Sequence, residues 1–112
     1  MKLAEVLAGP DKWTQQASAR DKLGESVEVL DPTACRYCLY GAACALALRL
    51  QKPSYRLISL VADVIVEKHP QYDGYSKYNV IVSFNDAPNR KFEEVQAVVA
   101  EVDRKRGKHE AG

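Results

Sequence analysis

The strongest constraint on the fold is an uncharged run from Cys38 to Leu48 that has no wide polar face. Asp31 and Pro32, just before it, suit the N-cap and the first position of a helix, and Ala, Leu and Cys fill the turns that follow. We therefore predict a helix over residues 32–50. Because no face of this run is polar, other parts of the chain must cover it nearly all round. The run is too short to cross a bilayer, which takes about 20 apolar residues.

A short helix and a hairpin are expected before this central helix. Apolar residues at helical spacing predict a short amphipathic helix at the N-terminus, ended by Gly9 and Pro10. Residues 12–19 alternate loosely between apolar and polar side chains, and a turn-forming segment separates them from residues 26–30. This pattern predicts a small β-hairpin.

Two further helices are expected after the central one. Ser54 is a suitable N-cap for a helix that ends near His69. The polar and Tyr-rich residues 71–78 predict a surface loop, and the apolar run 79–84 favours a short strand. A last helix follows, with Gly107 at its C-terminal cap. Its apolar stripe consists of Val95, Val98, Val99 and Val102.

Together these elements predict a mainly α (α+β) fold, with three longer helices around a buried central helix 32–50, a short N-terminal helix and a small β-hairpin. A chain of 112 residues suits one globular domain over residues 1–112, with 107–112 as a flexible tail. The net charge of +1 argues against a surface field strong enough to hold DNA or an anionic membrane without a local charged patch. The absence of a signal-peptide pattern and the three crowded cysteines favour a cytoplasmic location.

Five short motifs occur in a characteristic order along the chain. They are Trp13-Thr14-Gln15, Arg20-Asp21 with Gly24, Cys38-Leu39-Tyr40-Gly41-Ala42, Asn85-Asp86-Ala87-Pro88 and Glu94-Val95. In order and spacing they resemble an uncharacterised family of small bacterial and bacteriophage proteins. The resemblance implies a shared fold from the first helix to about residue 102, and a bacterial or phage setting. It implies no activity.

The sharpest chemical signal is the C-x-x-C pair Cys35 and Cys38 at a predicted helix start. Thioredoxin-like proteins keep their redox pair in this position. The same residues also suit a tightly packed helix as small buried side chains. Cys44 would lie nearly opposite Cys38 on the helix, so one metal ion does not easily reach both. We therefore expect no metal site and no cofactor.

The motifs also contain candidate binding residues, which are Trp13, Gln15, Arg20, Asp21, Asn85 and Asp86. A structural role is the alternative for each polar pair, because Asp and Asn side chains close turns by bonding to nearby backbone. In that case Asp86 closes the turn before the last helix. Trp13 would then anchor the hairpin.

The sequence contains no nucleotide-binding loop, paired-acid site or complete metal set. A non-catalytic module that binds a protein partner, with no membrane association, is therefore our interpretation. One alternative is a small thiol-dependent redox enzyme that uses Cys35 and Cys38. Another is a nucleic-acid-binding accessory protein, suggested by the basic segment 104–109 and the tyrosines of residues 71–78. Nucleic acid is not favoured, because cations are common in the last turn of any helix.

Overall fold

The uncharged run predicted to be buried lies in the centre of the chain as helix α2 (Leu39–Arg49). The computed structural model describes residues 1–111, with side chains for residues 1–108. The protein is mainly helical with a small antiparallel sheet, as predicted. The other elements are α1 (Leu3–Val6), η1 (Pro10–Lys12), β1 (Ala19–Arg20), β2 (Ser26–Val27), β3 (Arg36–Tyr37), α3 (Tyr55–Lys68), η2 (Pro70–Tyr72), α4 (Lys77–Asp86) and α5 (Phe92–Ala111).

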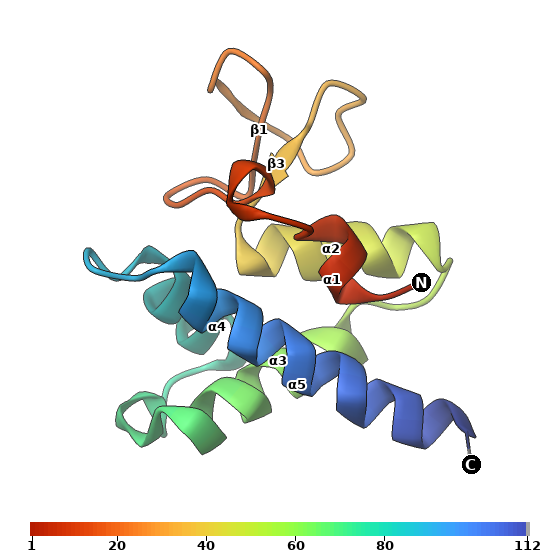
Figure 1. Ribbon diagram of the computed structural model, residues 1–112, viewed down its shortest axis with the longest axis vertical. Coiled ribbons are helices and arrows are strands. Elements are labelled where there is room, and N and C mark those ends of the chain that lie inside the picture. Colours follow the sequence, from red (N-terminus) through yellow and green to blue (C-terminus); the bar gives the residue numbers. More distant parts are fainter. Residues whose placement is uncertain (112) are drawn as a thin grey trace.

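The sheet consists of three very short strands in the order β2-β1-β3. The predicted hairpin forms, because β1 and β2 pair antiparallel with Ala19 opposite Val27. Its first strand is shorter than the predicted residues 12–19 and includes Arg20, which was expected in the turn. The sequence did not indicate β3, which pairs with the other edge of β1 and sets Tyr37 opposite Ala19. Figure 1 shows this sheet at one end of the long axis, beyond α2.

Helix α2 begins seven residues later than predicted, so the expected helix start at residue 32 is wrong. Asp31 does accept a hydrogen bond from a backbone N–H, but this bond closes a local turn and does not cap a helix. Its Oδ1 accepts from the Thr33 N–H at 2.8 Å. The chain then pairs with β1 through Arg36 and Tyr37. The N-cap of α2 is Cys38, whose Sγ accepts from a backbone N–H in the first turn. Sheet pairing over residues 36–37 therefore replaces the first two predicted turns.

The predicted strand over residues 79–84 is wrong, because this segment is part of α4. Ser76 caps the helix by accepting from the Asn79 N–H at 3.2 Å. Val80, Ile81 and Phe84 are buried at helical spacing. Burial on one face of a helix outweighs the weak strand preference of the β-branched residues.

The core lies where the helices meet. Helix α3 packs against α2, α4 and α5, while α1 packs against α2 and α5. The N-terminus of α1 is capped from the other end of the chain, because Asp103 of α5 accepts from the Leu3 and Ala4 N–H groups at 2.8 and 3.0 Å. Figure 1 shows α1 in front of α2. The largest fully buried side chains are Phe84, Leu3, Leu39, Leu46, Ile65, Ile81, Val61, Val64, Val80, Val95, Val98 and Val99.

Two predicted helix ends differ from the structure. Ser54 precedes α3 as expected, but its side chain makes no capping hydrogen bond. Gly107 lies inside α5, which continues to Ala111, so its predicted role as a C-terminal cap is wrong. At its other end, α5 is capped by Glu94, whose Oε1 accepts from the Lys91 N–H at 2.9 Å. This bond is one half of a capping box.

Candidate functional site

Asn85 lies at the centre of a hydrogen-bonded network that joins three parts of the chain. Its surface is completely buried (0%). Oδ1 accepts from Trp13 Nε1 at 2.7 Å and from the Leu39 N–H at 3.0 Å. Nδ2 donates to the Thr14 carbonyl at 3.1 Å and to Asp86 Oδ1 at 2.9 Å. Because all four hydrogen bonds of the amide are formed, Asn85 fixes the loop before β1 to the start of α2 and the end of α4.

Gln15 and Arg20 extend the same network. Gln15 Nε2 donates to the carbonyls of Asn85 and Ala87, at 2.9 and 3.0 Å, where α4 ends. Arg20 donates through Nε to Thr14 Oγ1 at 2.9 Å and through Nη2 to the Gln15 carbonyl at 3.1 Å. Side chains from separate motifs therefore satisfy the backbone groups of an irregular loop, which has no sheet ladder to do so.

Trp13 and Asp21 also make contacts within the protein. The Trp13 ring lies 6.1 Å from the Phe92 ring of α5, so it anchors the loop to the helical layer. Asp21 Oδ1 accepts from the Leu23 and Glu25 N–H groups at 2.9 and 3.0 Å. This carboxylate closes the β1–β2 turn, as an Asx turn does.

Asp86 does not close the turn before α5, so that predicted structural role is wrong. Its Oδ1 faces the loop before β1 and accepts from the Gln16 N–H at 2.9 Å as well as from Asn85 Nδ2. Gln16 takes φ +64°, a left-handed conformation that is uncommon outside glycine. The second oxygen, Oδ2, accepts no hydrogen bond from the described residues.

A groove of about 280 Å³ opens where these segments meet. We call it the Asp86 groove; it is lined by Gln16, Ala17, Ser18, Cys38, Tyr78, Val82 and Asp86. Tyr78, Val82 and Asp86 are four residues apart on α4, so they share one face of that helix. The loop before β1 forms the opposite wall. Two of the five motifs contribute to the lining, through Cys38 and Asp86, and both side chains also accept hydrogen bonds within the protein.

Tyr78 was expected at the surface, but its place beside Val82 and Asp86 was not indicated by the sequence. Tyr78 is 52% exposed, and its ring meets the Tyr40 ring edge to face at 4.9 Å. Val82 is half-buried, while Gln16 and Ser18 are exposed. The four-residue spacing of Tyr78, Val82 and Asp86 could have indicated this surface. It places the three residues on one face only if the segment is a helix, whereas a strand was predicted there.

The cysteine side chains are buried or half-buried within the fold. Cys38 is buried, and its Sγ accepts from the Gly41 N–H at 3.2 Å as the N-cap of α2. Burial raises the pKa of the Cys38 thiol, against the opposing effect of that hydrogen bond. Cys35 is half-buried just before β3, and Cys35, Cys38 and Cys44 are all free thiols. A raised pKa leaves little reactive thiolate at neutral pH, which disfavours nucleophilic or redox chemistry at Cys38.

Three cations of the basic segment 104–109 are paired with acids, while His109 lies outside the residues whose side chains the structure describes. The ion pairs are Arg104 with Glu101, Lys105 with Glu67 at 2.9 Å, and Arg106 with Asp103 at 3.4 Å. Cations that are already paired offer less attraction to nucleic acid phosphates. Of the three tyrosines suggested for base stacking, Tyr72 is committed to the fold, because its hydroxyl accepts from Arg90 Nη2 at 3.2 Å.

Neither a metal cluster nor a membrane-spanning helix is found in the part of the chain that the structure describes. Within residues 1–108, no three His, Cys, Asp or Glu side chains lie close enough together to hold a metal ion. None of the helices in the described part of the chain is both long and apolar enough to span a lipid bilayer.

Comparison with known proteins identifies a family but no activity. No curated protein and no solved structure matches this chain. A family described only as of unknown function matches residues 2–104, which includes all five motifs and every residue of the Asp86 groove. The chain therefore belongs to the family of unknown function DUF6197.

Proposed function

We propose that this protein is a single-domain, non-catalytic interaction module of the bacterial cytoplasm that binds a protein partner through the Asp86 groove. The partner segment carries an Arg or Lys next to an apolar side chain. The observation that carries the proposal is the composition of the groove: an Asp with a free carboxylate oxygen, in line with Val82 and an exposed Tyr78 on α4.

The charge of Asp86 supports a basic partner residue. Oδ1 is held by two donors, Gln16 N–H and Asn85 Nδ2, so the carboxylate is fixed in orientation while Oδ2 remains available. A fixed carboxylate forms strong charge-assisted hydrogen bonds with Arg or Lys at little further entropic cost.

Tyr78 and Val82 support an apolar contact beside that charge. Tyr78 is held by its edge contact with Tyr40, and a rigid exposed tyrosine is typical of interface centres. Val82 is half-buried between Tyr78 and Asp86 on the same helix face. A partner side chain that covers Val82 would bury apolar area while its basic neighbour pairs with Asp86.

A peptide-library selection tests this proposal. Displayed random peptides are selected on the purified protein, and the bound pool is sequenced. We expect enrichment of Arg or Lys adjacent to Leu, Ile, Met or an aromatic residue, and loss of these peptides on Asp86→Asn and Tyr78→Ala. A pool with no such pattern, or one that binds Asp86→Asn equally well, would contradict the proposal.

Asp73→Asn serves as the matched control. Asp73 is an exposed carboxylate just before α4 and lies outside the Asp86 groove. Its removal changes the net charge by the same amount as Asp86→Asn. Selected peptides should therefore bind Asp73→Asn as they bind the parent, which separates a local contact from a general effect of charge.

A further inference from the structure

A second pocket lies where the end of α2, the start of α3 and α5 meet, and has a volume of about 390 Å³. We call it the Lys52 pocket. It is lined by Ala47, Leu50, Lys52, Pro53, Tyr55, Arg56, Leu57, Leu60 and Arg106. It shares no residue with the Asp86 groove. Its volume falls in the range of about 300 to 1,000 Å³ that is typical of small-molecule sites.

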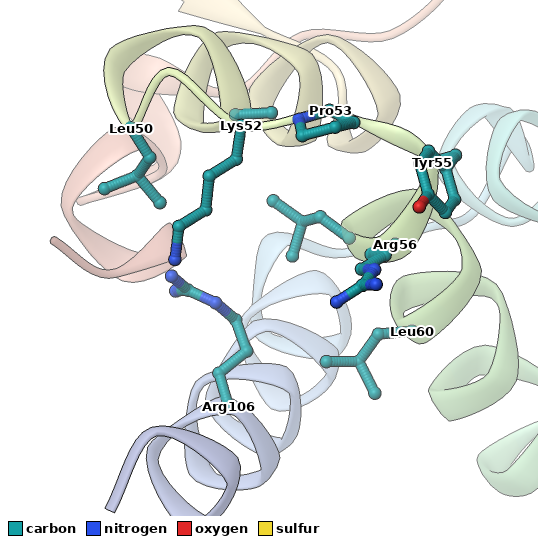
Figure 2. A pocket seen from close by; sticks show the side chains of 9 residues that line it. Leu50, Lys52, Pro53, Tyr55, Arg56, Leu60 and Arg106 are labelled. Atoms are coloured by element: carbon teal, nitrogen blue, oxygen red, sulfur yellow. The ribbon is translucent and has the colours of Figure 1, made fainter.

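Three cationic side chains meet at this pocket. Figure 2 shows Lys52 and Arg106 pointing toward one another, and Arg56 directed into the same space from α3. Arg106 is paired with Asp103 at 3.4 Å. Among the described side chains, no acid forms an ion pair with Lys52 or Arg56. Lys52 and Arg56 therefore contribute positive charge that no described acid pairs, and a bound anion would be attracted to both of them.

The rest of the lining is apolar. Leu57 and Ala47 are buried, and Leu50 and Leu60 are half-buried. Figure 2 shows Leu50 and Leu60 on opposite sides of the pocket. A purely ionic ligand such as inorganic phosphate would leave these side chains uncovered, whereas an apolar chain would bury them.

The turn that ends α2 holds Lys52 in place. Gln51 adopts φ +55°, and the Lys52 N–H donates to the Ala47 carbonyl at 3.0 Å while the Gln51 N–H donates to the Leu48 carbonyl at 3.1 Å. This pair of bonds is a Schellman motif. The turn therefore fixes the backbone from which the Lys52 side chain extends over the pocket.

From these features we propose that the Lys52 pocket binds a small amphiphilic anion, with a carboxylate or phosphate head between Lys52 and Arg56 and an apolar body against Leu57 and Leu60. The size and the apolar lining distinguish this site from a nucleic-acid surface, which needs cations spread along a backbone. The two sites are independent, so loss of one does not affect the proposal for the other.

Methyl NMR of the intact protein, titrated with decanoate, tests the assignment. We expect saturable shifts of the Leu57 and Leu60 methyl groups, and at least about tenfold weaker binding of decan-1-ol, which lacks the charge. Arg56→Gln and Lys52→Gln should each weaken decanoate binding by about three- to tenfold. Both side chains are exposed, so the fold should tolerate these changes.

Arg36→Gln is the matched control, because Arg36 is an exposed arginine of β3 outside the pocket. It should bind decanoate like the parent. Equal affinity for decanoate and decan-1-ol, undiminished binding to Arg56→Gln, or shifts outside the pocket would overturn the assignment. Retention on phosphatidylglycerol vesicles without any response to free decanoate would also overturn it, because it indicates a membrane surface as the source of the anion.

Discussion

Replacement of Asn85 by Ala should strongly destabilise the protein. The change removes all four hydrogen bonds of a side chain with no exposed surface. Three of its partners, Trp13 Nε1, the Leu39 N–H and the Thr14 carbonyl, then lose that hydrogen bond. Asp86 Oδ1 is less affected, because it keeps the Gln16 N–H.

The size of the effect follows from these three partners. A buried polar group left without a hydrogen bond costs about 1 to 3 kcal/mol. Allowing for some entry of water beside the partly exposed loop, the loss in free energy of unfolding should be about 3 to 6 kcal/mol. Domains of this size are stable by about 5 to 15 kcal/mol, so the melting temperature should fall by more than about 10 °C.

Urea unfolding provides the measurement. The chain has a single tryptophan, so the fluorescence of Trp13 reports on the network while circular dichroism reports on the helices. Asn79→Ala is the control on the same helix, because Asn79 is exposed, and it should change the free energy of unfolding by less than about 0.5 kcal/mol. A free energy of unfolding for Asn85→Ala within about 1 kcal/mol of the parent's would show that the network does not stabilise the fold, and would refute this prediction.

Three further changes test other parts of the structure. Gly41→Ala would set a Cβ 2.0 Å from the Ser18 carbonyl oxygen. The free energy of unfolding should therefore fall by at least about 3 kcal/mol, despite the better helix propensity of alanine. A thermal melt equal to that of the parent would contradict this close approach. Gln51→Gly should raise the free energy of unfolding by about 0.5 to 1 kcal/mol, because glycine adopts the left-handed conformation without strain. Chemical denaturation measures this change, and a lower free energy of unfolding would contradict the prediction. Burial, followed by the charge of Arg90, lowers the pKa of His69. The unfolded state then binds the proton more readily, so stability should fall as pH drops through about 6.5. Melts between pH 7 and 5 should show a weaker dependence of melting temperature on pH for His69→Gln, and an unchanged dependence would count against this prediction.

The sequence predicted the helical layer well because apolar periodicity depends on burial alone. The valine stripe of α5 is buried as expected, and so is most of the uncharged run of α2, although Leu48 is exposed and Tyr40 and Cys44 are half-buried. The start of α2 was misplaced because Asp31 and Pro32 resemble a helix start locally. Pairing of Arg36 and Tyr37 with β1 is a long-range contact that no local pattern contains. The assignment of residues 79–84 failed for a related reason, since a short apolar run does not distinguish a strand from a buried helix.

The candidate site was predicted only in part. Motif residues Trp13, Gln15, Asn85 and Asp86 were named as candidate binding residues, and the structure joins them in one network. Their hydrogen-bond partners could not be predicted, because these depend on how a loop without regular structure meets the end of α4. Arg90 shows the same limit: it was not singled out, yet it donates to the Phe84 carbonyl at 2.8 Å and lies over the Phe84 ring.

The proposed role of the Asp86 groove is tested most directly by Asp86→Asn, measured for both stability and peptide binding. An asparagine oxygen can keep the two hydrogen bonds that Oδ1 accepts from Gln16 and Asn85, while the charge is removed. We therefore predict a melting temperature within about 2 °C of the parent and at least about tenfold weaker binding of the selected basic peptides. A melting temperature lowered by several degrees with peptide binding unchanged would contradict the account, because Asp86 would then serve only the fold.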